Sequence, residues 1–372
     1  MKILYISKLD WFRTKQRPQQ LVEHLSQEDK VDFLSIKPWK KKDVKLDTVN
    51  NVKSKLTRGN LTVYRKKVTP KRESLIGEKI SDLIMKRYIK ELFAKEKYDV
   101  IICTLPHHVK YLSKTLRCPV VYDCMDDQVE MSENKEKALK EEMALLRVAD
   151  QVVVSSEYLK SQLRKKYNYG MPIEVINNGV DVDKFYNYHI KYGNQYKKSN
   201  IVGYVGSIDY WMDFNAIEKA ATNFPQYKFL FYGPISSIVK SKTKSLPENV
   251  QFLGAVNYDD VPKVINSFEV AIMPFEINDL IRAVNPVKLY EYLALGKKTI
   301  ASEYSETAKF GSLITRYSTS EDFKNKISEL MEKKESKAEE KKKILFTFEN
   351  SWSERAKELR RVCKAVLGKR AI

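Results

Sequence analysis

Short apolar runs, each followed by a polar loop and a helical pattern, recur along this 372-residue chain and constrain its fold more than any other feature. Residues 99–104 and 119–123 are two such runs, and they are apolar nearly throughout instead of alternating with polar residues. Continuously apolar strands are typical of parallel sheets that helices cover on both faces. The chain is therefore predicted to be α/β, with doubly wound parallel sheets.

A second set of strand and helix patterns begins at residue 201, after a polar segment at 186–200 that we interpret as a linker. The chain is long enough for two domains that each bury a core of their own. With 43% hydrophobic and 31% charged residues, the composition predicts a soluble globular protein. No apolar run approaches the roughly 20 residues that cross a bilayer, and residues 1–6 resemble a first strand more than a signal peptide.

The cysteines and histidines give no metal-site pattern. Cys103, Cys118, Cys124 and Cys363 lack C-x-x-C spacing, and the four histidines have no ligand spacing with them. Three of these cysteines lie in or beside apolar strand-like runs. We therefore expect buried thiols in a reducing cytoplasm, and no bound metal.

The net charge of +19 is uneven, because residues 37–97 hold 19 Lys/Arg against 7 Asp/Glu. Such a patch attracts the phosphates of a nucleic acid or an anionic membrane, and no motif for nucleic-acid binding accompanies it. Within the patch, residues 73–97 have a helical pattern with Lys79, Lys86 and Lys90 on one stripe. For this helix alone, core packing with a solvated lysine face is the better interpretation. Together with the charge of the preceding loop, it favours contact with an anionic membrane surface.

Polar side chains follow the predicted strands at the edge where open α/β sheets bind ligands. Asp126 and Asp127 follow the strand at 119–123, and His107 and His108 follow the strand at 99–104. Arg17 stands at a helix start after the first strand. Helix capping explains Asp126 or Asp127 as well as substrate contact does, and Arg17 fits equally a phosphate contact or a surface residue. The two histidines are weaker candidates.

The segment from Asn285 to Gly296 predicts a helix with both ends marked. Asn285 is a good N-cap, Pro286 suits the first helical position, and Gly296 supplies a left-handed stop. The N–H groups at such a helix start can hold a phosphate. Lys288 and Glu291 share a face, which puts a cation near that anion site and a carboxylate one turn deeper. An ordinary surface ion pair is the alternative.

Five different segments of the chain carry a resemblance through their order and spacing: 17–20, 123–127, 178–181, 249–254 and 285–296. Together they resemble retaining glycosyltransferases of the GT-B type, more narrowly the family-4 transferases of bacterial cell-surface polysaccharides, teichuronic-acid-like members included. The resemblance implies two Rossmann-like doubly wound domains that face an interdomain cleft. The N-terminal, acceptor-binding domain would cover residues 1–185, joined by a C-terminal helix at 351–372. The nucleotide-sugar-binding domain would cover residues 199–350.

The resemblance also implies roles for single residues. Three are expected to be catalytic: Asp126 as base or orienter of the acceptor hydroxyl, and Arg282 and Lys288 as stabilisers of the leaving diphosphate. Glu291 would bond the nucleotide ribose. The expected substrate-binding residues are Arg17, Asp127, Gly206, Ser207, Gly233, Gly254, Ala255, Asn285 and Glu291. No cofactor and no metal are expected, because in this family helix dipoles and basic residues hold the diphosphate.

The implied activity is transfer of a sugar from a nucleotide-diphosphate sugar, UDP favoured, to a polysaccharide or lipid-linked acceptor with retention of configuration. The protein would be cytoplasmic and peripheral to the inner face of the plasma membrane, with no nucleic-acid partner. Two departures favour a non-catalytic scaffold as an alternative: Ala283 replaces the usual Glu, and residues 207–213 lack the usual Arg and Lys clamp. A nucleotide-sugar epimerase on the same fold is a further alternative, although it needs carboxylates placed for proton abstraction.

Overall fold

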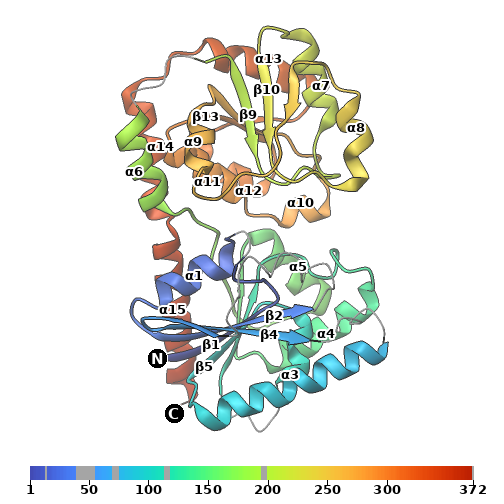
Figure 1. Cartoon of the computed structure of the whole chain (residues 1–372), viewed down its shortest axis with the longest axis vertical. Helices are drawn as coiled ribbons and strands as arrows, with labels where there is room; N and C mark the ends of the chain where they lie inside the picture. The colour runs from blue at the N-terminus through green and yellow to red at the C-terminus, as the bar shows by residue number, and fades with distance from the viewer. Residues whose placement is uncertain (13–14, 39–54, 69–74, 113–117, 194–198, 371–372) are drawn as a thin grey trace. The chain divides into compact units, whose positions relative to one another are not determined.

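The computed structural model describes all residues except 13–14, 39–54, 69–74, 113–117, 194–198 and 371–372. Its contacts divide the chain into two compact units (Figure 1). Unit 1 comprises Met1–Ile176 with Arg355–Ile372, and unit 2 comprises Asn177–Glu354.

Unit 1 is built on an eight-stranded sheet in the order β3-β4-β2-β1-β5-β6-β7-β8, in which only β3 is antiparallel to its neighbour. The direction of the strand order reverses between β1 and β5, which makes their carboxyl ends a topological switch point. The strands are β1 (Lys2–Ser7), β2 (Lys30–Pro38), β3 (Lys55–Arg58), β4 (Leu61–Val68), β5 (Val100–Cys103), β6 (Val120–Cys124), β7 (Gln151–Val154) and β8 (Ile173–Val175). The central strands β1, β5, β6 and β7 are fully buried apart from Lys2, as continuous apolar runs predict.

Helices cover this sheet, and several begin at a side-chain cap. Asn134 and Ser156 accept from backbone N–H groups at the starts of α4 and α5. The helices of unit 1 are α1 (Arg17–Leu25), α3 (Leu75–Lys95), the 3₁₀ helix η1 (Pro106–Tyr111), α4 (Lys135–Val148), α5 (Glu157–Tyr167) and, from Arg355 onward, α15 (Trp352–Arg370).

Unit 2 has a six-stranded, entirely parallel sheet in the order β11-β10-β9-β12-β13-β14, with its switch point between β9 and β12. Helix α7 packs against α13, and α11 packs against α6 and α14. The strands are β9 (Ile201–Val205), β10 (Lys228–Tyr232), β11 (Val250–Phe252), β12 (Val270–Met273), β13 (Lys298–Ser302) and β14 (Thr315–Tyr317). The helices are α6 (Val182–Tyr192), α7 (Phe214–Asn223), η3 (Ser237–Val239), α8 (Lys240–Lys244), α9 (Val261–Asn266), α10 (Asp279–Ala283), α11 (Val287–Ala294), α12 (Ser305–Ala308), η4 (Gly311–Leu313), α13 (Ser320–Glu332) and α14 (Lys337–Glu349).

The predicted linker at 186–200 is wrong in its first part, which is helical in α6. Of this helix only Val182 and Phe185 are fully buried, so its polar sequence concealed the helix. Phe185 belongs to the core of unit 2, and the division between the units accordingly falls after Ile176, ahead of the expected boundary at 185.

Other sequence predictions are confirmed. All four cysteines are buried as free thiols, as expected. Among the described helices, none combines the length and apolar character that a bilayer crossing requires.

Gly203 is required by close packing in the centre of the second sheet. A Cβ built on this residue would lie 2.2 Å from two ring carbons of Phe268, a side chain that is itself buried in the core. Real Cβ atoms do not approach that closely, so a larger residue here must displace the ring.

We expect Gly203→Ala to destabilise unit 2 by about 1–3 kcal/mol through overpacking. The measurement is urea-induced unfolding followed by circular dichroism. Gly170→Ala is the control, because a Cβ at that position meets nothing within 4 Å. Equal stability of the two variants would contradict the packing argument.

Candidate functional site

The switch point of unit 2 is bordered by two loops that are hydrogen-bonded to each other. The loop at 206–213 follows β9 and the loop at 274–278 follows β12. The N–H of Glu276 donates to the carbonyl of Trp211 at 2.7 Å. Open α/β sheets bind ligands at this position, outside the carboxyl ends of the strands.

Three predicted glycines bring neighbouring backbones together at the same edge. The N–H of Gly206 donates to the carbonyl of Tyr232 at 2.9 Å, and the N–H of Gly233 donates to that of Gly254 at 2.7 Å. A Cβ on Gly233 would lie 1.8 Å from the oxygen of Gly206, and Gly254 has a φ of +79°. Only glycine fits where these backbones approach so closely. The main chain itself therefore forms the edge of the sheet after β9, β10 and β11.

Helix α11 begins one residue later than the sequence predicts. Its N-cap is Pro286, no side chain caps it, and the prediction of Asn285 as N-cap is wrong. Gly296 has a φ of +66°, so the predicted left-handed stop is confirmed. The first N–H groups of the helix have no partner within the helix.

Asn285 holds in place the segment that leads into α11. Its Oδ1 accepts from the N–H of Asn178 and its carbonyl accepts from the Asn178 amide, both at 2.8 Å. Its Nδ2 donates to Glu306 at 2.8 Å, and the residue is 2% exposed. The structure therefore places this predicted substrate contact inside a buried network that fixes the approach to α11.

Lys288 and Glu291 form an ion pair on the first turns of α11. The Lys288 ammonium donates to Oε2 of Glu291 at 2.9 Å. The glutamate side chain is only 4% exposed, whereas that of the lysine is 30% exposed. An ammonium group has three donors, so Lys288 can keep this carboxylate while it binds an anion at the helix start.

Three further predicted residues, Ser207, Ala255 and Arg282, have exposed side chains on loops or on the short helix α10. Ser207 also accepts, through its carbonyl, from the hydroxyl of Tyr204 at 3.1 Å. Ala283, which stands where a glutamate was expected, is buried at the end of α10. The exposed cation of this segment is thus Arg282, next to an apolar residue that packs inward.

Tyr292 supports the switch point from inside the protein, and the sequence reasoning missed it. Its hydroxyl accepts from the N–H of Val205 at 3.2 Å and donates to the carbonyl of Ile272 at 3.3 Å, joining α11 to both strands at the switch point. Burial raises the pKa of this phenol well above its ordinary value, so it stays a donor. A tyrosine one position after Glu291 in an apolar helix was the available signal.

In unit 1 the structure places Arg17 inside the protein. Its Nη2 lies 2.9 Å from Oδ1 of Asp123, its Nη1 donates to the carbonyl of Ile176 at 2.9 Å, and it is 5% exposed. The hydroxyl of Tyr5 donates to the other Asp123 oxygen at 2.9 Å. The interpretation of Arg17 as a surface residue is therefore wrong, and its guanidinium is bound by protein acceptors. Asp123, a charged residue in an apolar strand, was the signal for this pair.

Asp126 and Asp127 differ in their surroundings although they are neighbours. Asp127 accepts at 3.1 Å from the N–H groups of Val129 and Glu130, so it caps a turn, the structural alternative weighed for it. Asp126 is half-buried at the carboxyl end of β6. Burial raises the pKa of the Asp126 carboxyl, although Lys8 and then Arg17 act in the opposite direction. A raised pKa suits a group that exchanges a proton with a substrate.

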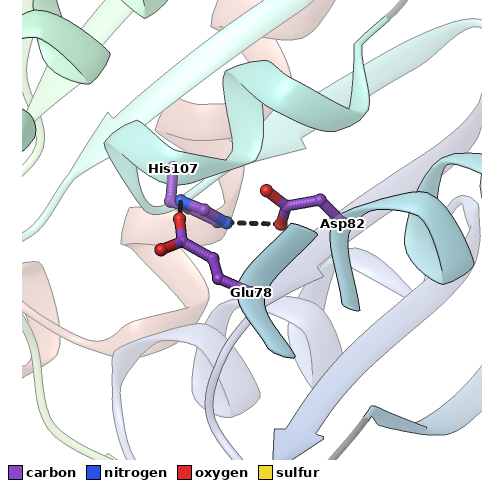
Figure 2. A group of neighbouring side chains, drawn as sticks. All are labelled: Glu78, Asp82 and His107. Carbon is purple, nitrogen blue, oxygen red and sulfur yellow. Dashed lines mark hydrogen bonds and ion pairs between the residues drawn. The ribbon is translucent and has the colours of Figure 1, made fainter. Parts of the chain in front are cut away.

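His107 joins a charged cluster away from these residues, between α3 and α4. Glu78 and Asp82 of α3 point toward its ring (Figure 2). One ligand atom from each of the three residues lies within 4.8 Å of the others, a spacing that a cation could use. The ammonium groups of Lys110 and Lys137 already bind Glu78, so protein cations balance its negative charge.

Two family models match successive parts of the chain. Residues 51–184 match the model for glycosyltransferase family 4, and residues 188–345 match that for glycosyl transferases group 1. Over 209 residues the chain is 29% identical to TuaH of Bacillus subtilis (strain 168), whose name assigns it to teichuronic acid biosynthesis as a glycosyltransferase. This match covers 51% of the chain and 52% of TuaH, so it spans about half the length of the curated relative.

Solved structures of similar fold cover nearly the whole chain. Sucrose-phosphate synthase from Thermosynechococcus elongatus has a TM-score of 0.76 at 17% identity, with 99% of each chain covered. Alr3699/HepE from Anabaena, in complex with UDP and glucose, has a TM-score of 0.70 at 15% identity, covering 98% of this chain and 99% of its own. The structure of trehalose-6-phosphate from E. coli bound with UDP-2-fluoro glucose has a TM-score of 0.74 at 9% identity, covering 98% of this chain and 99% of its own. At these identities the likeness shows the fold, which is GT-B as predicted.

We expect Arg17→Met to destabilise unit 1 by about 3–5 kcal/mol, because it leaves the Asp123 carboxylate buried without its cation. The double variant Arg17→Met/Asp123→Leu should recover much of this loss. Lys15→Met is the matched control, since its ion pair with Glu23 is partly exposed and should contribute less than about 1 kcal/mol. Urea-induced unfolding measures all three, and a cost for Arg17→Met no larger than that of the control would refute the buried role.

Proposed function

The chain belongs to the GT-B glycosyltransferases of family-4 type, and from this membership we propose that it transfers a sugar from a nucleotide-diphosphate sugar, UDP favoured, to a polysaccharide or lipid-linked acceptor. The observation that carries the donor half of the proposal is the Lys288–Glu291 pair on the first turns of α11, beside the switch point of a parallel sheet. The helix start with Lys288 suits a diphosphate, and the buried carboxylate suits hydroxyl groups of the ribose.

In the proposed reaction, the bond between the anomeric carbon and the diphosphate oxygen breaks while a bond to the acceptor oxygen forms. Arg282, Lys288 and the first N–H groups of α11 stabilise the negative charge that develops on the leaving diphosphate. The acceptor proton passes to a phosphate oxygen or to Asp126, whose raised pKa favours proton uptake. Configuration is retained because the acceptor attacks from the face that the diphosphate leaves.

The names of the relatives support the class of substrate. TuaH is named for teichuronic acid biosynthesis, and the Anabaena protein of similar fold was solved with UDP and glucose. We therefore assign this chain to cell-surface glycan synthesis, with a uridine donor.

A thermal-shift panel of UDP, GDP, TDP and CMP tests the donor site. We expect one diphosphate to stabilise the native protein by about 2.7 kcal/mol at a hundredfold excess over its Kd. Glu291→Ala should abolish most of this shift, because it removes the proposed ribose contact. Glu349→Ala, an exposed glutamate at the end of α14, is the matched control and should keep the shift.

A non-catalytic scaffold is the second candidate, and buried Ala283 is the observation that favours it. In that case no sugar is transferred from any nucleotide-sugar in a turnover assay, whether or not a diphosphate binds. Absence of a shift with every nucleotide would also favour the scaffold.

We also propose that the outer face of α3 contacts an anionic membrane. Ile76, Ile80 and Leu83 are 74%, 44% and 68% exposed, so these three apolar side chains face solvent. Exposed basic residues flank or continue the same face: Lys79, Lys86, Arg87 and Lys90. An apolar strip bordered by cations is typical of a helix that lies in the plane of an anionic membrane surface.

Vesicle flotation tests the membrane contact. The protein should float with vesicles of phosphatidylcholine and phosphatidylglycerol but not with phosphatidylcholine alone, and more weakly at high salt. Charge reversal of Lys79, Lys86 and Lys90 should weaken binding at least a hundredfold, since each basic residue contributes about 1 kcal/mol.

Ile76→Ser/Leu83→Ser should also release the protein from these vesicles. Ile190→Ser/Ile238→Ser is its control, because those side chains are equally exposed but belong to unit 2. Equal loss of binding in the two double variants would refute a specific role for α3.

A further inference from the structure

Both ring nitrogens of His107 face carboxylates. Nε2 lies 2.8 Å from Oδ1 of Asp82, and Nδ1 lies 3.1 Å from Oε1 of Glu141 and 3.9 Å from Oε1 of Glu78. An ionised carboxylate only accepts hydrogen bonds, so both nitrogens must donate. A neutral imidazole has one N–H, and this geometry therefore requires the imidazolium form.

The charges around this ring are balanced. Three carboxylates face it, from Glu78 and Asp82 on α3 and from Glu141 on α4. Lys110 of η1 binds Glu78 and Glu141 at 2.9 Å and Asp82 at 3.6 Å. Lys137 of α4 also pairs with Glu78. With the imidazolium, three positive groups meet three negative ones.

The same cluster attaches the N-terminal half of α3 to the unit. In this half the residues facing inward are small or charged, namely Gly77, Glu78, Ser81 and Asp82. Among residues 76–95, for which burial is described, the large apolar side chains that are buried come later in the helix: Met85, Ile89 and Leu92. Ionic contacts therefore carry a larger share of the attachment over residues 76–83 than over residues 84–95.

We propose that His107 is a proton-operated clasp, which holds the first half of α3 against α4 when the ring is protonated and releases it when the ring is neutral. On loss of the proton, the hydrogen bond from one nitrogen becomes a repulsion between its lone pair and a carboxylate. The cluster is then left with one unpaired negative charge in a half-buried place.

The pKa directions agree with this geometry. Burial alone would lower the pKa of His107, but the hydrogen bonds to Asp82 and Glu141 and their charges raise it above its ordinary value. The pKa of Glu141 is lowered despite its burial, because His107 and Lys110 stabilise its charge. A histidine with a raised pKa stabilises the closed form fully below about pH 6.5, and this contribution is lost as the pH rises through the raised value.

Hydrogen exchange of α3 between pH 6 and pH 9, corrected for intrinsic exchange rates, tests the clasp. We expect amides of residues 76–83 to open up to about tenfold more per pH unit across the transition, because one proton is released. Residues 84–95 should change much less. An NMR titration of the histidine rings should give His107 a pKa above that of a free histidine.

Two variants of the same residue sharpen the test. His107→Gln cannot become charged, so residues 76–83 should be open at every pH and insensitive to it. His107→Arg is always charged and keeps two donors, so the segment should stay protected up to pH 9. His189→Gln removes a histidine of unit 2 and should leave the response of α3 unchanged.

Several outcomes would overturn the clasp. They are exchange of residues 76–83 that does not depend on pH, the same pH dependence in His107→Gln, or protection at pH 8 that appears only when Zn²⁺ is added, which would make the cluster a metal site. The experiment needs neither lipid nor nucleotide, so its failure is separate from failure of the proposed function.

Discussion

The buried contact between Arg17 and Asp123 fixes the edge of the first sheet at which its chemistry is expected. A guanidinium with almost no exposure must satisfy its donors inside the protein, and here it joins the start of α1, the end of β6 and the carbonyl of Ile176. Asp126 follows three residues after Asp123, so its position depends on the same contact. In unit 2 the corresponding edge is fixed by different means. Glycine backbones meet directly, and the Asn285 amide holds the start of α11 without a buried arginine in the contact.

Much of this architecture was predictable from the sequence. Continuous apolar runs indicated parallel strands, and the order of short segments indicated two Rossmann-like halves, because both signals are local. Gly296 ended its helix as predicted for the same reason. Long-range partners were not predictable: Asp123 is 106 residues from Arg17, and Asn178 is 107 residues from Asn285. The sequence offered Arg17 a local role as a helix-start residue and Asn285 a local role as an N-cap. In the structure each side chain instead binds a partner that is distant in the sequence.

Helix α3 shows a second limit of sequence reasoning. Its apolar residues recur at helical spacing, which predicts a helix but does not say that every apolar position faces the core. The inward positions near its start are Gly77 and Ser81, while Ile76 and Leu83 face outward. A helix that exposes isoleucine and leucine while it buries glutamate and aspartate has been shaped by something other than core packing. The proposed membrane contact would account for the exposed apolar residues, and the charge pairing with η1 and α4 accounts for the buried acidic ones.

Unit 1 is made of two segments that are far apart in the sequence, and this affects how the chain folds during synthesis. Its sheet and first helices are made early, but Leu359, Val362, Cys363 and Val366 of α15 supply buried residues to the same unit. These residues leave the ribosome only after the whole of unit 2. Until then, the N-terminal segment of unit 1 lacks a part of its core. Unit 2 is contiguous in sequence and can fold as soon as it has been made. The order of domain completion is thus the reverse of the order of synthesis, and the incomplete N-terminal half is the species that needs protection from aggregation in the cell.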